Sequence, residues 1–175
     1  GIYKASAQIR NPKDIQQKWK TDTSRHTVPL NELTVVLKRN KIQPINDPHY
    51  INKTKALKEL IREQPVIALE VNGKARAYPL AVLSFHEIVN DRIGGTPVGI
   101  TYCPLCNSSP VFKRKVTYKG TERVLTLGTS GMLRKSNLVM WDEETETWWQ
   151  QFTGKAIVGE MTGAKLEMLP SMVIS

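Results

Sequence analysis

Two cysteines three positions apart form the most distinctive chemical feature of the sequence. Cys103 and Cys106 are the only cysteines of the chain, and they lie in the segment 101–108 (TYCPLCNS). Two thiols at this spacing can form a disulfide, bind one metal ion together, or act as attacking and resolving thiols in an exchange reaction. The spacing alone favours none of these chemistries over the others.

For the redox chemistry, a Cys-Pro-x-Cys segment after a strand is typical of the glutaredoxin active site, where the first Cys begins a long helix. Here the residues that follow are Asn107-Ser108-Ser109-Pro110 and then the strand-like pair Val111-Phe112. This pattern does not favour the long helix of a thioredoxin fold. A dithiol exchange site on a different scaffold remains consistent with the sequence.

For metal binding, the two thiols need further ligands, and His86 is the best candidate. We expect it on a helix over residues 79–90, at the margin of the apolar face that includes Val82 and Val89. A set of His86, Cys103 and Cys106, completed by Met132, Met140 or a second His, would favour copper(I) or zinc. A single C-x-x-C is a weak zinc signal, however. The alternatives are a His86 ring bonded to a backbone carbonyl, and a structural disulfide or two buried thiols.

A third chemistry is nucleophilic catalysis by one of the cysteines. Cys103 or Cys106 would be the catalytic residue, and it would need a base within hydrogen-bond reach. His86 is the histidine closest to them in sequence, and Asn107 or Asp91 could orient its ring.

A second candidate site lies in the segment 127–132 (LGTSGM), which is followed by Arg134. Glycines next to small hydroxyl residues and a basic side chain can bind an anion through backbone N–H groups. We therefore consider an anion or small-ligand pocket formed by Ser130, Gly131 and Arg134 in a loop. A plain turn between two strands is the alternative.

The elements that must position these residues are mainly strands. Asn72-Gly73 between two apolar runs predicts a hairpin over residues 66–78. Two short helices are expected, over residues 54–63 and 79–90. Further strands are predicted at 98–102, 111–116, 123–127, 138–141 and 147–152. We predict a mainly β (α+β) fold in which an antiparallel sheet is closed or folded into a barrel or sandwich, with two or three short helices. Residues 1–28 would be an N-terminal arm, and residues 29–175 a single globular domain.

Composition excludes several classes of protein. The chain has 175 residues, 40% of them hydrophobic, which suits one folded domain and argues against disorder. No apolar run approaches the roughly 18 to 20 residues of a membrane-spanning helix. The 25 Lys and Arg exceed the 16 Asp and Glu by nine. Because the basic residues are dispersed along the chain, this charge does not favour nucleic-acid binding.

From about Trp19 onward, the sequence resembles an uncharacterised prokaryotic family catalogued as domain of unknown function 3179. The matching stretches include 65–67 (PVI), 72–80 (NGKARAYPL), 86–91 (HEIVND), 94–98 (GGTPV), 101–108 (TYCPLCNS), 130–134 (SGMLR) and 148–154 (WWQQFTG). The resemblance implies no activity. Members look like secreted or membrane-anchored proteins, so the resemblance implies an extracytoplasmic location and favours a Cys103 to Cys106 disulfide or a copper site.

The sequence thus predicts an extracytoplasmic protein that binds copper or zinc, or performs thiol redox chemistry, through the C-P-L-C loop and His86. One alternative is an enzyme with a cysteine nucleophile. The other is a non-catalytic module that assembles with envelope proteins.

Overall fold

The computed structural model describes residues 8–11, 17–59 and 63–175, and the fold of these residues is mainly β. Three sheets build the body: sheet A in the order β1-β9-β10-β11-β12, sheet B in the order β13-β6-β5-β4, and sheet C in the order β14-β2-β3. β7 and β8 form a separate hairpin. All strand pairs are antiparallel.

The strands of sheet A are β1 (Leu33–Val35), β9 (Leu127–Arg134), β10 (Asn137–Asp142), β11 (Trp148–Gln150) and β12 (Lys155–Val158). The strands of sheet B are β4 (Ile88–Ile93), β5 (Thr96–Thr101), β6 (Val111–Lys113) and β13 (Met168–Leu169). The strands of sheet C are β2 (Val66–Val71), β3 (Lys74–Pro79) and β14 (Met172–Ile174). The separate hairpin consists of β7 (Lys115–Tyr118) and β8 (Thr121–Val124).

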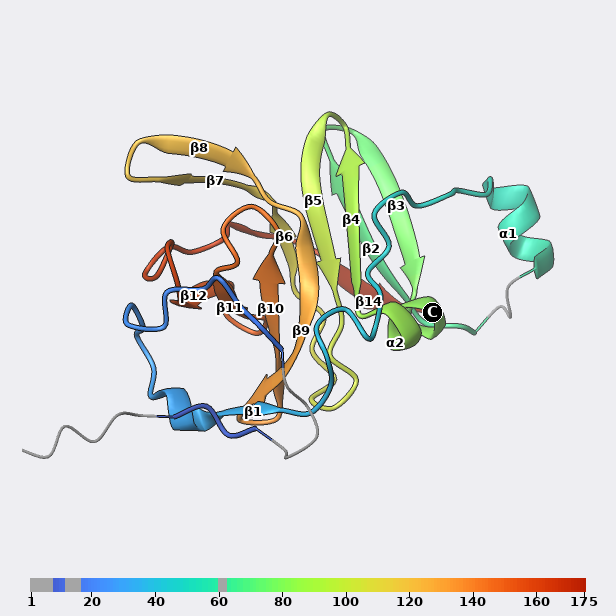
Figure 1. Cartoon of the computed structure of the whole chain (residues 1–175). Helices are drawn as coiled ribbons and strands as arrows, with labels where there is room; N and C mark the ends of the chain where they lie inside the picture. Colours follow the sequence, from blue (N-terminus) through green and yellow to red (C-terminus); the bar gives the residue numbers. More distant parts are fainter. Residues whose placement is uncertain (1–7, 12–16, 60–62) are drawn as a thin grey trace, which may run out of the picture.

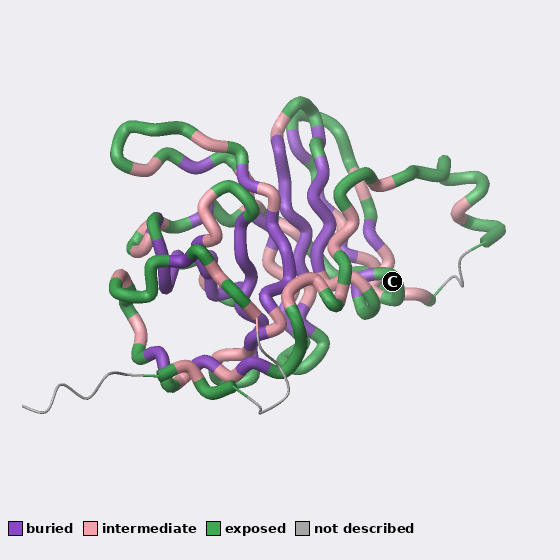
Figure 2. Tube along the Cα trace, viewed as in Figure 1, coloured by how far each residue is buried: buried purple, intermediate pink, exposed green. Residues whose placement is uncertain are grey.

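The sheets are stacked as layers (Figure 1), and their central strands are buried along most of their length (Figure 2). Alternate residues of one strand enter different cores. In β4, Ile88 packs in the core between sheets A and B, whereas Val89 packs in the core between sheets B and C. In β11, Trp149 belongs to the first of these cores and Trp148 to a third core on the outer face of sheet A. Both indoles are fully buried. Sheets A and B are therefore apolar on both faces.

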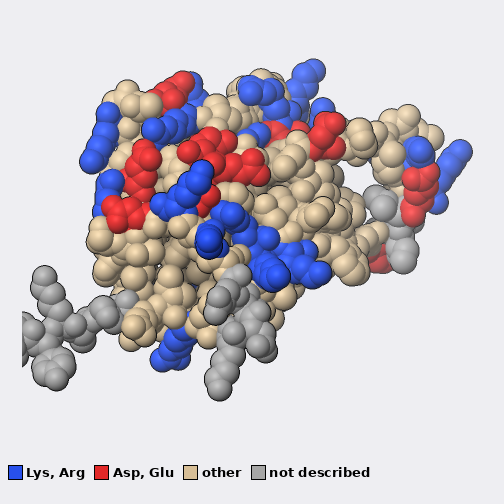
Figure 3. Space-filling model, viewed as in Figure 1, with Lys and Arg blue, Asp and Glu red and all other residues tan. Residues whose placement is uncertain are grey.

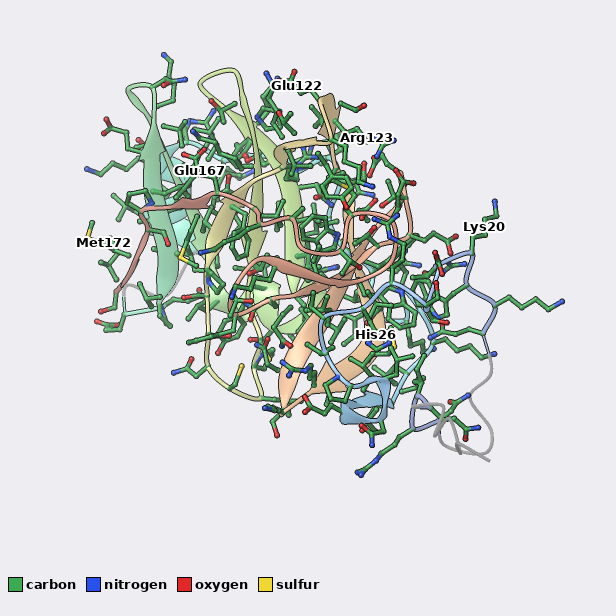
Figure 4. The ribbon with its side chains drawn as sticks, turned by 90° about the vertical axis from the view of Figure 1, so that its left-hand side faces the viewer. Lys20, His26, Glu122, Arg123, Glu167 and Met172 are labelled. Atoms are coloured by element: carbon green, nitrogen blue, oxygen red, sulfur yellow. The ribbon has the colours of Figure 1, made fainter. Side chains whose placement is uncertain are left out.

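Described residues of the predicted N-terminal arm cover the outer face of sheet A. The Arg10 N–H donates to the Leu33 carbonyl at 2.9 Å. Trp19 packs edge-on against Trp141 and Trp148, with ring centroids 5.5 Å and 5.3 Å apart. Aromatic pairs favour this geometry, and they contribute stability beyond the area they bury. In Figure 4, Lys20 and His26 of the arm lie on the opposite side of the molecule from Met172 of β14.

The predicted hairpin is confirmed: β2 and β3 pair from Val66 with Pro79 to Val71 with Lys74. Asn72 and Gly73 both have positive φ, 51° and 71°. A two-residue hairpin turn requires this conformation, which is why Asn-Gly is the most informative local pair in the sequence.

The predicted helix over residues 79–90 is too long. The helix α2 ends at His86 (Leu80–His86), and β4 begins at Ile88. Glu87 between them has φ 59°, which breaks the helix, and the β-branched residues after it pair with β5. The other predicted helix corresponds to α1 (Lys53–Glu59), and residues 60–62 of that prediction lie outside the described residues. A short 3₁₀ turn, η1 (Leu30–Glu32), precedes β1.

The segment 127–132, predicted as a loop together with Arg134 after it, is instead part of the strand β9, which has a register shift opposite Val139 and Met140 of β10. Gly128, Thr129 and Ser130 are buried, and neighbouring chain segments pass close to the strand. A Cβ on Gly131 would lie 2.1 Å from the Leu37 carbonyl oxygen, for example. The predicted antiparallel sheet architecture is present, but none of the sheets in the described residues closes into a barrel.

On the face that Figure 3 shows, basic and acidic side chains are interspersed. Within the described ranges, no helix is both long and apolar enough to cross a membrane.

Candidate functional site

The C-P-L-C loop connects β5 to β6 at one end of the interface between sheets A and B. Its base is closed by backbone hydrogen bonds, from the Cys103 N–H to the Ser108 carbonyl (2.9 Å) and from the Cys106 N–H to the Cys103 carbonyl (3.3 Å). Cys103 is 1% exposed and packs in the core between the two sheets, whereas Cys106 is exposed. Both thiols are free: the Cys103 Sγ lies 3.9 Å from the Ser136 carbonyl oxygen, and the Cys106 Sγ lies 3.9 Å from the Cys103 carbonyl oxygen. The loop therefore presents one thiol to solvent and keeps the other beneath it.

Asn137, the first residue of β10, donates a hydrogen bond to the exposed thiol. Its Nδ2 lies 3.2 Å from the Cys106 Sγ. Its Oδ1 accepts from the backbone N–H of Phe152 at 3.0 Å and from Gln150 Nε2 at 2.5 Å. A backbone N–H can only donate, so the oxygen of the amide must face Phe152 and the NH₂ group must face the sulfur. The orientation of this donor is fixed by the protein.

Gln151, the residue after β11, is oriented in the same way. Its Nε2 donates to the Ser108 carbonyl (3.1 Å) and to Thr101 Oγ1 (2.9 Å), so its Oε1 faces the other way. That oxygen accepts from Asn137 Nδ2 at 2.7 Å and from Ser108 Oγ at 2.8 Å. Gln151 thus holds the two polar side chains, Asn137 and Ser108, that contact the Cys106 sulfur.

The Ser108 hydroxyl can exchange hydrogen-bond partners when the thiol ionises. Its oxygen lies 2.8 Å from Gln151 Oε1 and 3.1 Å from Cys106 Sγ, but it has one proton. While Cys106 is protonated, its S–H can donate to Ser108 Oγ, and the hydroxyl proton points at Gln151. Once Cys106 is a thiolate, the hydroxyl can rotate and donate to the sulfur.

These contacts separate the acidities of the two thiols. Burial opposes ionisation of Cys106, but hydrogen bonds from the Ser108 and Asn137 side chains, the Cys103 thiol and the Ser108 backbone outweigh it, so the Cys106 pKa is lowered. Burial raises the pKa of Cys103, and its hydrogen bond to Cys106 raises that pKa further. The thiolate is the reactive form of cysteine, so Cys106 is the more reactive thiol.

Strained backbone surrounds the loop. Asn107 has φ 48°, and Lys135 and Ser136, which form the turn before Asn137, have φ 50° and 61°. Glu87, whose carbonyl accepts from the Tyr102 N–H, has φ 59°. Residues with side chains adopt this conformation at a cost of about 1 kcal/mol or more, and such residues are concentrated at functional sites.

The structure does not join His86 to the two cysteines in a metal-ligand group. His86 ends α2, and its Nδ1 lies 2.8 Å from the Gln43 carbonyl oxygen. In the part of the chain that the structure describes, no three His, Cys, Asp or Glu side chains lie close enough together to hold a metal ion. Asn107 and Asp91 do not orient His86 either: Asn107 accepts from Tyr102 at 3.2 Å, and Asp91 from two other tyrosines.

The residues of the predicted anion pocket lie in β9 and bond to other protein groups. The Ser130 hydroxyl is buried and donates to the Val139 carbonyl at 2.5 Å. The Arg134 guanidinium pairs with Glu32 at 2.5 Å and donates to Gln150 at 3.2 Å. Arg134 thereby extends the amide network behind Asn137.

Sequence reasoning missed three residues of the site: Ser108, Asn137 and Gln151. Ser108 is two positions from Cys106, and its small hydroxyl side chain was the available signal. Asn137 is 31 positions from Cys106, and Gln151 is 43 from Ser108, so only the pairing of β10 with β11 brings them to the loop.

The fold and the site define a layered antiparallel β protein with an exposed, activated thiol above a buried one. The chain belongs to DUF3179, a family of proteins of unknown function, whose family model matches residues 39–175. No curated protein and no solved structure matches the chain.

Proposed function

We propose that this protein is a thiol-disulfide exchange protein in which Cys106 attacks and Cys103 resolves. The observation that carries the proposal is the asymmetry of the pair: the exposed thiol has a lowered pKa and the buried thiol beside it has a raised one. An attacking thiol must be accessible and ionised. A resolving thiol needs only to reach its neighbour.

The exchange starts when the Cys106 thiolate attacks one sulfur of a substrate disulfide. The substrate's S–S bond breaks, one substrate sulfur leaves as a thiolate that takes up a proton, and a mixed disulfide forms at Cys106. Cys103 then loses its proton to solvent and attacks the Cys106 sulfur, which releases the second substrate thiol. The products are a substrate dithiol and a Cys103 to Cys106 disulfide, and two electrons pass from the protein to the substrate. The reverse sequence oxidises a substrate dithiol.

The hydrogen bonds to Cys106 favour the oxidising direction. A thiolate accepts hydrogen bonds from Ser108 and Asn137 more strongly than a disulfide sulfur can. The network therefore stabilises the reduced protein, and a stabilised reduced form makes the disulfide a stronger oxidant. This role suits the extracytoplasmic location that the family resemblance implies, where disulfides persist.

Equilibration with mixtures of reduced and oxidised glutathione, followed by mass spectrometry, tests the proposal. We expect a reversible Cys103 to Cys106 disulfide with a reduction potential less negative than about −230 mV. In partial alkylation of the reduced protein with iodoacetamide at neutral pH, Cys106 should be labelled first. The proposal fails if no such disulfide forms at any ratio, or if Cys103 is labelled as fast as Cys106.

A soft metal ion is the second candidate, because the two adjacent thiols could hold copper(I) in two-coordinate geometry. Zinc requires about four ligands, and the described residues near the loop supply two. Metal analysis of protein purified without a His tag tests this candidate. Copper that is retained at one equivalent, and lost in Cys106→Ser, would favour it over the redox role.

The enzyme with a cysteine nucleophile has weaker support. No hydrogen bond to the Cys106 sulfur within the described ranges comes from a histidine; an amide, a hydroxyl and the second thiol provide them. The thiol is therefore activated without a general base, which suits exchange better than acyl transfer.

A further inference from the structure

A large cavity lies on the opposite side of the stacked sheets from the arm, around β3, an edge strand of sheet C. Its volume is about 1020 Å³, at the upper limit of small-molecule sites, and α1 with the segment before it forms one wall. Figure 1 shows α1 projecting away from the sheets, and Figure 3 shows the opening between it and the body. None of the residues that line the cavity belongs to the thiol site.

One side of the cavity is formed by small apolar residues of sheet C, with Glu70 on the same face. Residues of sheet C alternate between the core and the cavity: Ile67 and Leu69 are buried, whereas Ala68 faces outward, paired with Ala77. Met172 of β14 lies beside Ala68 and is 65% exposed. Small side chains at these positions leave the space that an apolar chain can fill.

The other side of the cavity has an unsatisfied cation. β3 is an edge strand, and its inward-facing residues Arg76 and Tyr78 line the cavity together with Tyr50. The Arg76 guanidinium stacks over the Tyr50 ring at 4.5 Å, and its Nη1 donates to the Ala75 carbonyl at 3.1 Å. Its buried Nε has no hydrogen-bond partner among the described residues.

The free group of this guanidinium selects the charge of the ligand. Nε is buried, and Nη2 makes no hydrogen bond with the described residues, so Nη2 is the N–H group that can donate to a carboxylate. The nearby Asp91 does not supply that carboxylate, because its Oδ2 accepts from both Tyr50 and Tyr78 and its Oδ1 accepts from the Arg92 N–H at 2.6 Å. No ion pair of the described residues involves Arg76. Lys53 adds a second cation to the lining, and Glu70 is the single acidic residue among the described residues that line it.

We propose that this cavity binds a single-chain amphiphilic carboxylate of the fatty-acid type. The carboxylate accepts from Nη2 of Arg76, next to the phenol groups of Tyr50 and Tyr78. The apolar chain passes around the edge of β3 and lies on the alanine face, against Met172. This site is independent of the proposed thiol exchange.

The test is a titration of ¹⁵N-labelled protein with decanoate, followed by ¹H–¹⁵N NMR, with decanol as the uncharged comparison. We expect saturable shifts in residues 75–78 and in the Arg76 Nε–H signal, with decanoate bound more tightly than decanol. Arg76→Met should weaken decanoate at least about tenfold and leave decanol unchanged, whereas Arg76→Lys should restore part of the affinity. The matched control is Arg123→Met, which removes a partly exposed arginine of the β7–β8 hairpin that is paired with Glu160.

Ala77→Trp provides a second variant, because Ala77 is exposed on the cavity face and an indole there fills the cavity without disturbing the core. It should abolish the binding of both ligands. The proposal is overturned if decanol binds as tightly as decanoate, or if the shifts are unsaturable and scattered over the surface. It is also overturned if the shifts appear only with phosphatidylglycerol vesicles, because the face would then bind a membrane surface.

Discussion

Asn137 Nδ2 lies 3.2 Å from the Cys106 sulfur, and the Phe152 backbone determines that the nitrogen, not the oxygen, faces it. Asn137 begins a strand that is buried on both faces, so this donor is held in position before the thiol ionises. A donor already aimed at a developing charge needs no reorganisation. Cys106 reactivity should accordingly depend on residues far from it in sequence.

Replacing Asn137 with Leu removes the oriented donor. We expect the Cys106 pKa to rise, because a thiolate that loses a hydrogen bond is less stable. Alkylation of Cys106 by iodoacetamide at neutral pH should slow about tenfold. The measurement is the pH dependence of the rate in a Cys103→Ser background, with near-ultraviolet circular dichroism to verify folding. A folded variant with an unchanged pH profile would show that Asn137 does not activate the thiol.

The Ser108 hydroxyl should contribute separately. In Ser108→Ala, the thiolate loses the donor that can rotate toward it, so alkylation at neutral pH should slow several-fold and the reduction potential should become more negative. Ser109→Ala is the matched control, since Ser109 makes no hydrogen bond to the sulfur in the described residues. Equal effects of the two substitutions would contradict the proposal that the Ser108 hydroxyl turns from Gln151 to the Cys106 thiolate.

Glu87 should make stability depend on pH. Burial raises its pKa from 4.5 to about 7, so between these values the folded protein retains a proton that the unfolded chain releases. The free energy of unfolding should therefore fall as the pH rises from about 4.5 to 7. Burial also raises the Asp91 pKa, which adds a decrease of the same sign.

Urea denaturation of Glu87→Gln across this pH range should show a smaller slope than the wild type, with the Asp91 contribution remaining. Glu122→Gln, at an exposed position of β8, is the comparison and should leave the slope unchanged. A wild-type slope in Glu87→Gln would disprove the assignment.

Gly131 and Gly73 have almost the same φ, 76° and 71°, but different surroundings. A Cβ on Gly73 would meet no atom within 4 Å, whereas one on Gly131 would lie 2.1 Å from the Leu37 carbonyl oxygen. Gly73→Ala should cost about 1 to 2 kcal/mol through strain alone. Gly131→Ala should cost at least about 1 kcal/mol more, because the chain over β9 must also move. Chemical denaturation of both variants measures the difference, and equal costs would show that this segment yields freely.

Elements whose conformation is determined by a few adjacent residues could be predicted from the sequence. Asn72-Gly73 specifies its turn through backbone conformations that these two residues adopt readily, and the hairpin is present. The end of α2 could not be predicted, because residues 88–90 continue an apolar pattern that fits a helix as well as a strand. Pairing with β5 across the Gly94-Gly95 turn decides between them, and the pattern of residues 88–90 alone does not show that pairing.

The candidate site could also be predicted from the sequence only where its signal is local. The cysteine pair is visible as a motif, but its asymmetry depends on which thiol the sheets cover. Asn137 and Gln151 resemble any other polar residues until β10 and β11 are placed beside the loop. The sequence pattern also predicts an anion pocket at Ser130, Gly131 and Arg134. It contains no signal that Leu37 passes over β9 and covers this segment.

Trp148 and Trp149 are neighbours in the chain, but they are buried in two cores on opposite faces of one sheet. Each indole is therefore an optical probe of a different boundary: Trp148 of the contact between sheet A and the arm, Trp149 of the contact between sheets A and B. Replacing Trp19, Trp141 and one of this pair with Phe would leave a single emitter, on strand β11. Fluorescence during denaturation would then report whether the arm and the inner sheets separate in one step or in two.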